Sequence, residues 1–119
     1  MQKNELIILY GTAYKEMTRQ ILKEADLASL IGNRKARIGL KPNLVNSTRP
    51  DNGGTTHTEV VEGALEYLQE NGFTDLVMLE GSWVGDNTQD AIRNCGYDKV
   101  SRKYGVPFID LQKDRKSVV

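Results

Sequence analysis

Short strand-length runs of mainly apolar residues alternate along the chain with longer segments in which apolar residues recur every three or four positions. The short runs are Leu6–Tyr10, Ala36–Leu40, Leu76–Leu79 and Phe108–Leu111. The first reads LIILY, without polar alternation, which is typical of a strand buried on both faces. The pattern therefore predicts four β-strands with helical segments between them.

The first longer segment runs from Tyr14 to about Leu30 and has apolar residues at helical spacing. Within it, Asp26 is a candidate cap for a second, short helix, which Gly32 would close. We therefore expect helical structure between the first and second strands, with a break near Asp26.

The clearest helix start lies at Thr56. Thr56 and Glu59, three residues apart, match a capping box, in which each side chain satisfies a backbone N–H group of the other residue. The helix is expected to end at Asn71-Gly72. Further on, the sequence predicts a short helix over Thr88–Asn94 and a helical turn over Asp98–Tyr104.

Strands that alternate with helices predict a parallel sheet with right-handed crossovers and helices on both of its faces. The expected fold is a three-layer α/β/α sandwich around a mostly parallel four-stranded sheet. With 119 residues, of which 39% are hydrophobic, the chain can bury one core. We therefore expect residues 1–119 to form a single α/β domain.

Charge and cysteine content narrow the classes of partner. Sixteen basic and sixteen acidic residues give a formal net charge of +0, so no overall field attracts nucleic acid or an anionic membrane. The only cysteine, Cys95, can form no internal disulfide and cannot hold an iron–sulfur cluster by itself. The apolar run Leu6–Tyr10 is too short for a signal peptide or a membrane span. We expect a cytoplasmic protein that binds neither nucleic acid nor membranes.

Polar residues follow the predicted strands, at the edge where open parallel sheets usually bind ligands. Two follow the second strand, two follow the third, and the others belong to the NGGTTH stretch that leads into the next helix. The predicted ligand-binding residues are Lys41, Asn43, Gly54, Thr55, Thr56, His57, Glu80 and Ser82.

A helix start behind a glycine-containing loop favours anions, because its first N–H groups lack helical partners and carry the positive end of the helix dipole. Lys41 would add an opposing positive charge. The stretch is neither a P-loop nor a dinucleotide-binding fingerprint, since no Gly-Lys-Ser/Thr and no GxGxxG is present. The alternative is that Gly53-Gly54 only turns the loop and Thr56 only caps the helix, so that no ligand binds.

The only histidine, His57, is the candidate catalytic residue. At a helix start the dipole favours a neutral imidazole, which suits a proton acceptor; the alternative is an exposed histidine without a role. No spacing of ligand residues groups His57 with Glu80, Asp86 or Asp110, so no metal site is predicted.

The stretches KPNLV, GGTTHTEVVEGALEYLQENGFTDLVMLEGS and NTQDAIRNCGYDKVSRKYGVPFIDL carry a family resemblance. Over about Arg37 to Asp110 the chain resembles the N-terminal half of domain-of-unknown-function family 362, most specifically at Lys41-Pro42-Asn43 and Thr55-Thr56-His57. Thr58 stands where members usually have proline. The resemblance implies a bacterial or archaeal α/β domain and no particular activity. It implies no cofactor in this chain and an iron–sulfur cluster only in relatives fused to ferredoxin-like modules.

Compared with that family, the chain is expected to be the N-terminal part of a longer domain. The first hypothesis is a site for a small anionic ligand, part of a redox-linked enzyme in full-length relatives. The alternative is a protein-interaction or structural module without ligand chemistry, and the sequence does not decide whether the protein is an enzyme. A homo-oligomer is also expected, because a strand such as Phe108–Leu111 would lie at an open sheet edge.

Overall fold

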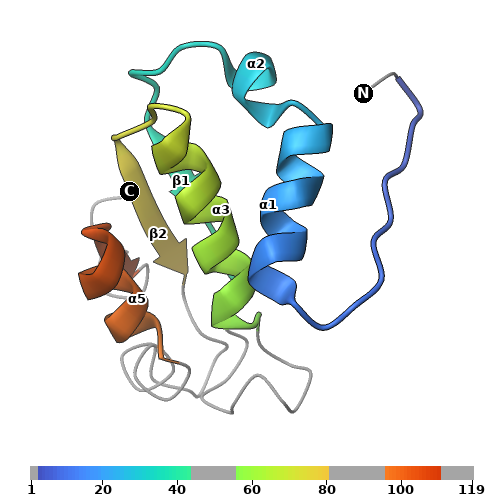
Figure 1. Cartoon of the computed structure of the whole chain (residues 1–119). Coiled ribbons are helices and arrows are strands. Elements are labelled where there is room, and N and C mark those ends of the chain that lie inside the picture. The colour runs from blue at the N-terminus through green and yellow to red at the C-terminus, as the bar shows by residue number, and fades with distance from the viewer. Residues whose placement is uncertain (1–2, 44–55, 81–95, 111–119) are drawn as a thin grey trace. The chain divides into compact units, whose positions relative to one another are not determined.

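The computed structural model describes residues 3–43, 56–80 and 96–110. These residues contain helices α1 (Tyr14–Glu24), α2 (Leu27–Ile31), α3 (Thr58–Glu70) and α5 (Tyr97–Tyr104), and strands β1 (Ile38–Leu40), β2 (Leu76–Glu80) and β3 (Phe108–Asp110) (Figure 1). The chain divides into two compact units: the first comprises Met1–Ala36 and Glu59–Asp75, the second Arg37–Thr58 and Leu76–Val119. In the described ranges, no helix is long and apolar enough to cross a membrane.

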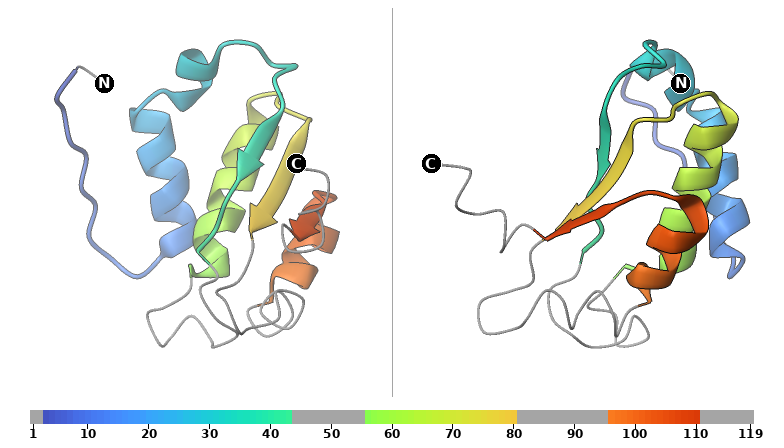
Figure 2. Two further views of the ribbon diagram at one scale, coloured as in Figure 1. Left: turned by 180° about the vertical axis from the view of Figure 1, so that it is seen from behind. Right: turned by 90° about the vertical axis from the view of Figure 1, so that its left-hand side faces the viewer.

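The second unit contains a parallel sheet in the order β1-β2-β3 (Figure 2). Ile38 pairs with Leu76, and Met78 pairs with Phe108, so the central strand β2 shares its hydrogen bonds with both neighbours. Leu76, Val77 and Met78 of β2 are buried, as expected of a strand that is apolar on both faces. The predicted α/β fold with a parallel sheet is confirmed, with three strands and four helices in the described residues.

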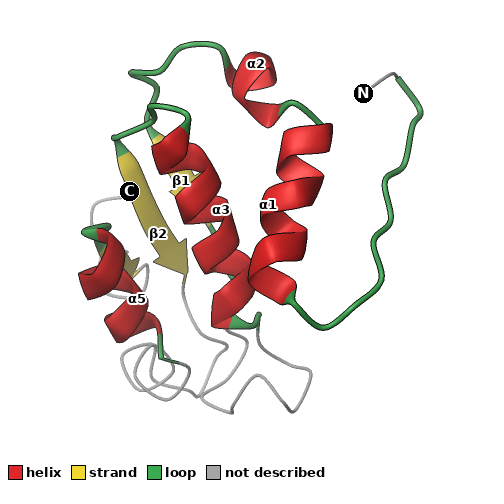
Figure 3. Cartoon of the chain, viewed as in Figure 1, coloured by secondary structure: helices red, strands yellow, loops and turns green. Residues whose placement is uncertain are grey.

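The prediction that Leu6–Tyr10 is a strand was wrong. The run has no regular secondary structure, as the green trace before α1 shows (Figure 3), and the side chains of Leu6 and Tyr10 are 80% and 92% exposed. A strand needs a hydrogen-bonded neighbour, and residues 6–10 make no hydrogen bond to another described residue. Apolar composition alone predicted the strand here.

The other three strands lie where the sequence placed them, with small shifts. β1 is shorter than the predicted Ala36–Leu40, and β2 continues one residue beyond Leu79. β3 confirms the last prediction as far as Asp110, and Leu111 lies outside the described residues.

The helices show two differences from the prediction. The break near Asp26 is present, and Asp26 adopts a left-handed conformation at φ 53°, but its side chain makes no capping hydrogen bond to α2. The helix expected from Thr56 begins at Thr58. The predicted turn over Asp98–Tyr104 is a full helix, α5, and the predicted helix over Thr88–Asn94 lies outside the described residues.

Within the first unit, α1 and α3 cross closely at Gly63. A Cβ atom added at Gly63 would lie 2.5 Å from the Lys15 carbonyl oxygen and 2.8 Å from the Thr18 Cβ. Glycine is therefore required for this separation of the helices. The hydroxyl of Tyr67, a buried residue of α3, accepts a hydrogen bond of 2.9 Å from the Ala28 N–H of α2.

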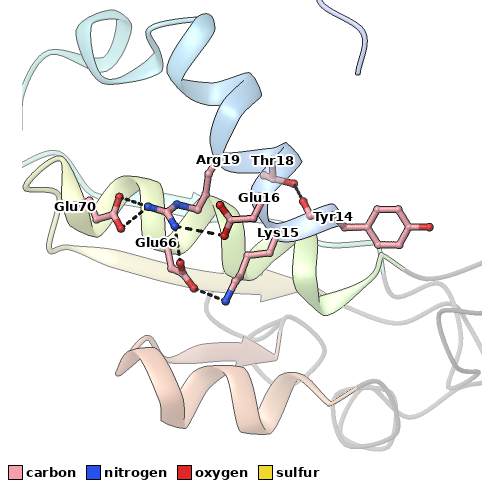
Figure 4. A network of polar contacts seen from close by, with 7 residues as sticks. All are labelled: Tyr14, Lys15, Glu16, Thr18, Arg19, Glu66 and Glu70. Carbon is pink, nitrogen blue, oxygen red and sulfur yellow. Dashed lines mark hydrogen bonds and ion pairs between the residues drawn. The ribbon is translucent and has the colours of Figure 1, made fainter. Parts of the chain in front are cut away.

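Charged side chains link the exposed sides of α1 and α3 (Figure 4). One guanidinium nitrogen of Arg19 lies 2.6 and 2.7 Å from the two carboxylate oxygens of Glu70, and the other lies 3.3 Å from Glu66. Lys15 Nζ lies 3.2 Å from the second oxygen of Glu66. Hydrogen bonding to Glu66 and then its charge raise the pKa of Lys15 above the usual 10.5.

Arg34 joins the carboxyl ends of two helices in the first unit. Its guanidinium donates to the carbonyl oxygens of Ala28 at 3.1 Å, Gly32 at 2.8 Å and Asn71 at 2.8 Å. The same group lies 4.8 Å from the centre of the Phe73 ring. Helix ends leave carbonyl groups without helical partners, and Arg34 supplies donors to the ends of α2 and α3 together.

Candidate functional site

The carboxyl ends of the three parallel strands lie at one edge of the sheet. β1 ends at Leu40 and is followed by Lys41, Pro42 and Asn43. Pro42 is buried, whereas Lys41 and Asn43 on either side of it are exposed. The proline therefore holds the turn against the unit and leaves both polar residues on the surface.

Asn43 and Thr56 are joined by two hydrogen bonds. The Thr56 N–H donates to the Asn43 carbonyl at 2.9 Å, and the Asn43 N–H donates to the Thr56 hydroxyl oxygen at 2.8 Å. The segment that leaves β1 is thus tied to the segment that enters α3. We call this arrangement of Lys41, Asn43, Thr56 and His57 the strand–helix junction.

The junction changes the role expected for Thr56. Because α3 begins at Thr58, His57 occupies the position before the helix, and the Thr56 hydroxyl accepts from Asn43 in another segment. The capping box predicted at Thr56 was therefore wrong. His57 itself is half-buried, at the positive end of the α3 dipole.

A third element supports the junction through Tyr97, the first residue of α5. Its hydroxyl donates a hydrogen bond of 2.6 Å to the Thr56 carbonyl, and its side chain is fully buried. The ring packs edge to face on Phe108 of β3, with centroids 5.9 Å apart. Tyr97 therefore fixes Thr56 from inside the second unit.

Sequence reasoning missed Tyr97. The available signal was the Gly96-Tyr97 pair ahead of an amphipathic segment, since Gly96 adopts φ 83° at the α5 start. A buried tyrosine normally needs a hydrogen-bond partner for its hydroxyl, but the partner is 41 residues away and no local pattern points to it.

The remaining predicted site residues divide into two groups. Glu80 and Asp110 occupy paired positions at the carboxyl ends of β2 and β3. Gly54, Thr55 and Ser82 lie outside the described residues, as does Asp86. Among the residues that the structure does describe, no group of three His, Cys, Asp or Glu residues could hold a metal ion.

The strand order affects where a ligand could bind. Doubly wound sheets bind ligands in a crevice where the strand order reverses. The three described strands follow one another in chain order, so no reversal occurs among them. A ligand site at this edge would therefore depend on the strand–helix junction itself.

A separate polar hollow of about 640 Å³ belongs to the first unit. It contains no residue of the predicted site, and its charged residues include the Arg19–Glu70 pair (Figure 4). The lining residues are Glu16, Arg19, Gln20, Lys23, Asp26, Tyr67, Glu70 and Asn71. Because Arg19 already contacts three carboxylates, we assign the hollow a structural role.

The described residues thus define an α/β domain with a parallel sheet and a polar junction at its carboxyl edge. The model of one protein family, Domain of unknown function (DUF362), matches residues 38–119, which is more than half of the chain. The chain belongs to the DUF362 family, as the residues around Lys41 and Thr56 suggested. No curated protein and no solved structure matched significantly.

Proposed function

We propose that this DUF362 domain binds a small anionic ligand at the strand–helix junction. The observation that supports the proposal is the pair of hydrogen bonds between Asn43 and Thr56, at 2.9 and 2.8 Å. These bonds hold the exposed Lys41 and Asn43 in a fixed segment next to the residue that precedes α3. A positively charged side chain and the positive end of a helix dipole are thereby held in one junction.

The chemistry of these groups suits a carboxylate or a phosphate. The Lys41 ammonium supplies a charge-assisted hydrogen bond, the Asn43 amide can donate, and the start of α3 contributes its dipole. Against this, Glu59 places a negative charge in the first turn of α3. An exposed site with one opposing carboxylate should bind weakly, with a dissociation constant of about a millimolar.

In full-length relatives the same junction would serve a redox-linked enzyme, with His57 as the candidate proton acceptor. The support for this extension is the half-buried position of His57 immediately before α3. The second candidate function is an interaction module without ligand chemistry. The exposed apolar residues Leu6, Ile8 and Tyr10 favour it, because contiguous apolar surface marks contact sites.

Titration with phosphate, citrate and a nucleotide, followed by backbone amide shifts, tests the ligand proposal. We expect saturable shifts at Thr56–Glu59. Lys41→Ala should weaken binding about tenfold, the effect of losing one charge-assisted contact. Lys35→Ala is the matched control, since it also removes an exposed lysine, three residues before β1 at the opposite end of that strand.

Three results would contradict the proposal. The first is the absence of amide shifts even well above the expected dissociation constant. The second is an equal loss of binding in Lys41→Ala and Lys35→Ala, which would indicate nonspecific charge attraction. The third is unfolding of Lys41→Ala, because an exposed residue after a strand should contribute little to the core.

A further inference from the structure

The residues Leu6–Tyr10, called the N-terminal segment below, have a strand-like alternation of exposure. Leu6, Ile8 and Tyr10 are 80%, 59% and 92% exposed, whereas Ile7 and Leu9 between them are half-buried. This period of two is that of an extended chain with one row of side chains covered and the other exposed. Figure 1 shows the segment as an extended run that leads into α1.

The covered row is anchored on the first unit. Leu9 lines an apolar hollow of about 320 Å³ together with Tyr14, Met17 and Ile21 of α1 and with Val60. The backbone at Gly11 also approaches α1, since a Cβ there would lie 3.0 Å from the Met17 sulfur. The position of the segment on α1 is therefore set by packing, and the exposed row is presented from a fixed base.

The backbone of the segment is open to pairing. Residues 6–10 make no hydrogen bond to another described residue, and the run contains no charge, proline or glycine. Natural proteins use such residues to prevent edge-to-edge pairing, and here they are missing. A second extended chain can therefore pair with the segment through backbone hydrogen bonds, and apolar side chains on that chain would match its exposed row.

We propose that the N-terminal segments of two copies of this chain pair antiparallel about a twofold axis at Ile8. In this register Leu6 lies opposite Tyr10, Ile7 opposite Leu9, and Ile8 opposite itself. It is the one antiparallel register that places all five apolar residues opposite apolar residues. The two exposed rows then lie side by side on one face of the paired strands, where opposite side chains contact each other, and the contact closes after two copies.

Charge and backbone conformation favour the same register. Asn4, at φ 67°, and Gly11 bound the extended run. Pairing about Ile8 sets Glu5 opposite Gly11, whereas pairing about Glu5 would set two carboxylates face to face. The formal net charge of +0 gives the two copies no overall repulsion.

Complementary charges at position 8 test the twofold contact. In sedimentation experiments across a wide concentration range, the unchanged chain should form a dimer. Ile8→Lys and Ile8→Glu should each raise the dimer dissociation constant about 100-fold, because each places like charges opposite one another and removes two isoleucines. A mixture of the two variants should restore dimers, since lysine then faces glutamate. Leu30→Lys, which changes a leucine of α2 that is 69% exposed, should leave the dimer intact.

Mixing Ile8→Lys with Ile8→Glu distinguishes a twofold contact at residue 8 from binding to a different surface and from misfolding of the variants. An unfolded variant cannot be rescued by a second unfolded variant, and a contact with a different surface does not place residue 8 opposite itself. A monomer at all concentrations, a dimer that survives Ile8→Lys, or a mixture that stays monomeric would overturn the proposal. Anion binding at the strand–helix junction involves other residues, so its failure would leave the dimer test unaffected.

Discussion

In the first unit the hydroxyl of the buried Tyr67 accepts a hydrogen bond from the Ala28 N–H at 2.9 Å, whereas in the second unit the buried Tyr97 hydroxyl donates to the Thr56 carbonyl at 2.6 Å. Each bond joins residues about forty positions apart, 39 in one case and 41 in the other. Tyr67 joins two helices, α2 and α3. Tyr97 instead fixes the segment that carries His57, so similar chemistry supports the scaffold in one unit and the candidate site in the other.

The polar surfaces of the two units differ in the same way. The Lys15, Arg19, Glu66 and Glu70 side chains of the first unit pair mainly with one another across α1 and α3 (Figure 4). At the junction of the second unit, the two hydrogen bonds between Asn43 and Thr56 are made by backbone groups and a threonine hydroxyl. Paired charges stabilise a helix contact in the first unit, whereas backbone hydrogen bonds fix the segment that carries the candidate site residues in the second. The following changes test this division.

The largest effect is expected at the helix crossing of the first unit. Gly63→Leu introduces a good helix former, so helix propensity alone would stabilise α3 by up to about 1 kcal/mol. The clash with the Lys15 carbonyl, 2.5 Å from the position of a Cβ, forces α1 and α3 apart and should dominate. We expect a net loss of about 3 kcal/mol or more in the free energy of unfolding, measured by urea denaturation.

Gly105→Ala is the control for this change. Gly105 ends α5 at φ 65°, and no atom lies within 4 Å of the position of an added Cβ. The cost is therefore only backbone strain, about 1 kcal/mol. Equal losses in the two variants would contradict a close helix crossing at Gly63.

The second-largest effect on stability is expected at the two buried tyrosines, Tyr67 and Tyr97. Tyr67→Phe and Tyr97→Phe each remove one hydroxyl and leave the Ala28 N–H or the Thr56 carbonyl without that partner. Each should therefore lower the free energy of unfolding by about 1–2 kcal/mol. If the strand–helix junction binds anions, only Tyr97→Phe should also weaken binding and shift the Thr56 and His57 amides. The same loss of binding in Tyr67→Phe would remove the distinction between the units.

The sequence predicted the parts of the fold that depend on local patterns. The runs at Ile38–Leu40, Leu76–Glu80 and Phe108–Asp110 became strands because each finds a neighbour in a parallel sheet. Leu6–Tyr10 has a stronger apolar pattern but no described neighbour, and it is not a strand. Strand formation depends on pairing, which is nonlocal, so composition could not separate these cases.

In the candidate site, too, contacts between residues far apart in the sequence could not be predicted from local patterns. Asn43 and Thr56, which the sequence assigned to the same edge of the sheet, are joined by two hydrogen bonds, whereas the grouping of Lys41 and His57 around a ligand stays a prediction. The support from Tyr97 could not be predicted, since it depends on how α5 is rotated against β3. The contacts of Arg19 with Glu66 and Glu70 likewise depend on the crossing of α1 and α3, which no pattern within either helix determines.

The smallest effect concerns the pH dependence of the Lys15–Glu66 pair in the first unit. Hydrogen bonding to Glu66, followed by its charge, raises the pKa of Lys15 above 10.5 in the folded chain. A raised lysine pKa means that the folded state holds this proton more tightly than the unfolded state does. The stabilisation is therefore fully present below about pH 10.5 and is lost as the pH rises through the higher folded pKa.

Lys15→Met should be slightly less stable than the unchanged chain at neutral pH, and the difference in thermal midpoint should shrink above pH 10.5. Both side chains are partly exposed, at 36% and 20%, so added salt should also reduce the difference. Lys23→Met, on the same helix, removes an exposed charge without removing the Glu66 contact and corrects for the general effect of alkaline pH. If the difference between Lys15→Met and the unchanged chain stays constant to high pH, the ion pair contributes nothing to the first unit, and packing at Gly63 and Tyr67 accounts for the contact between its helices.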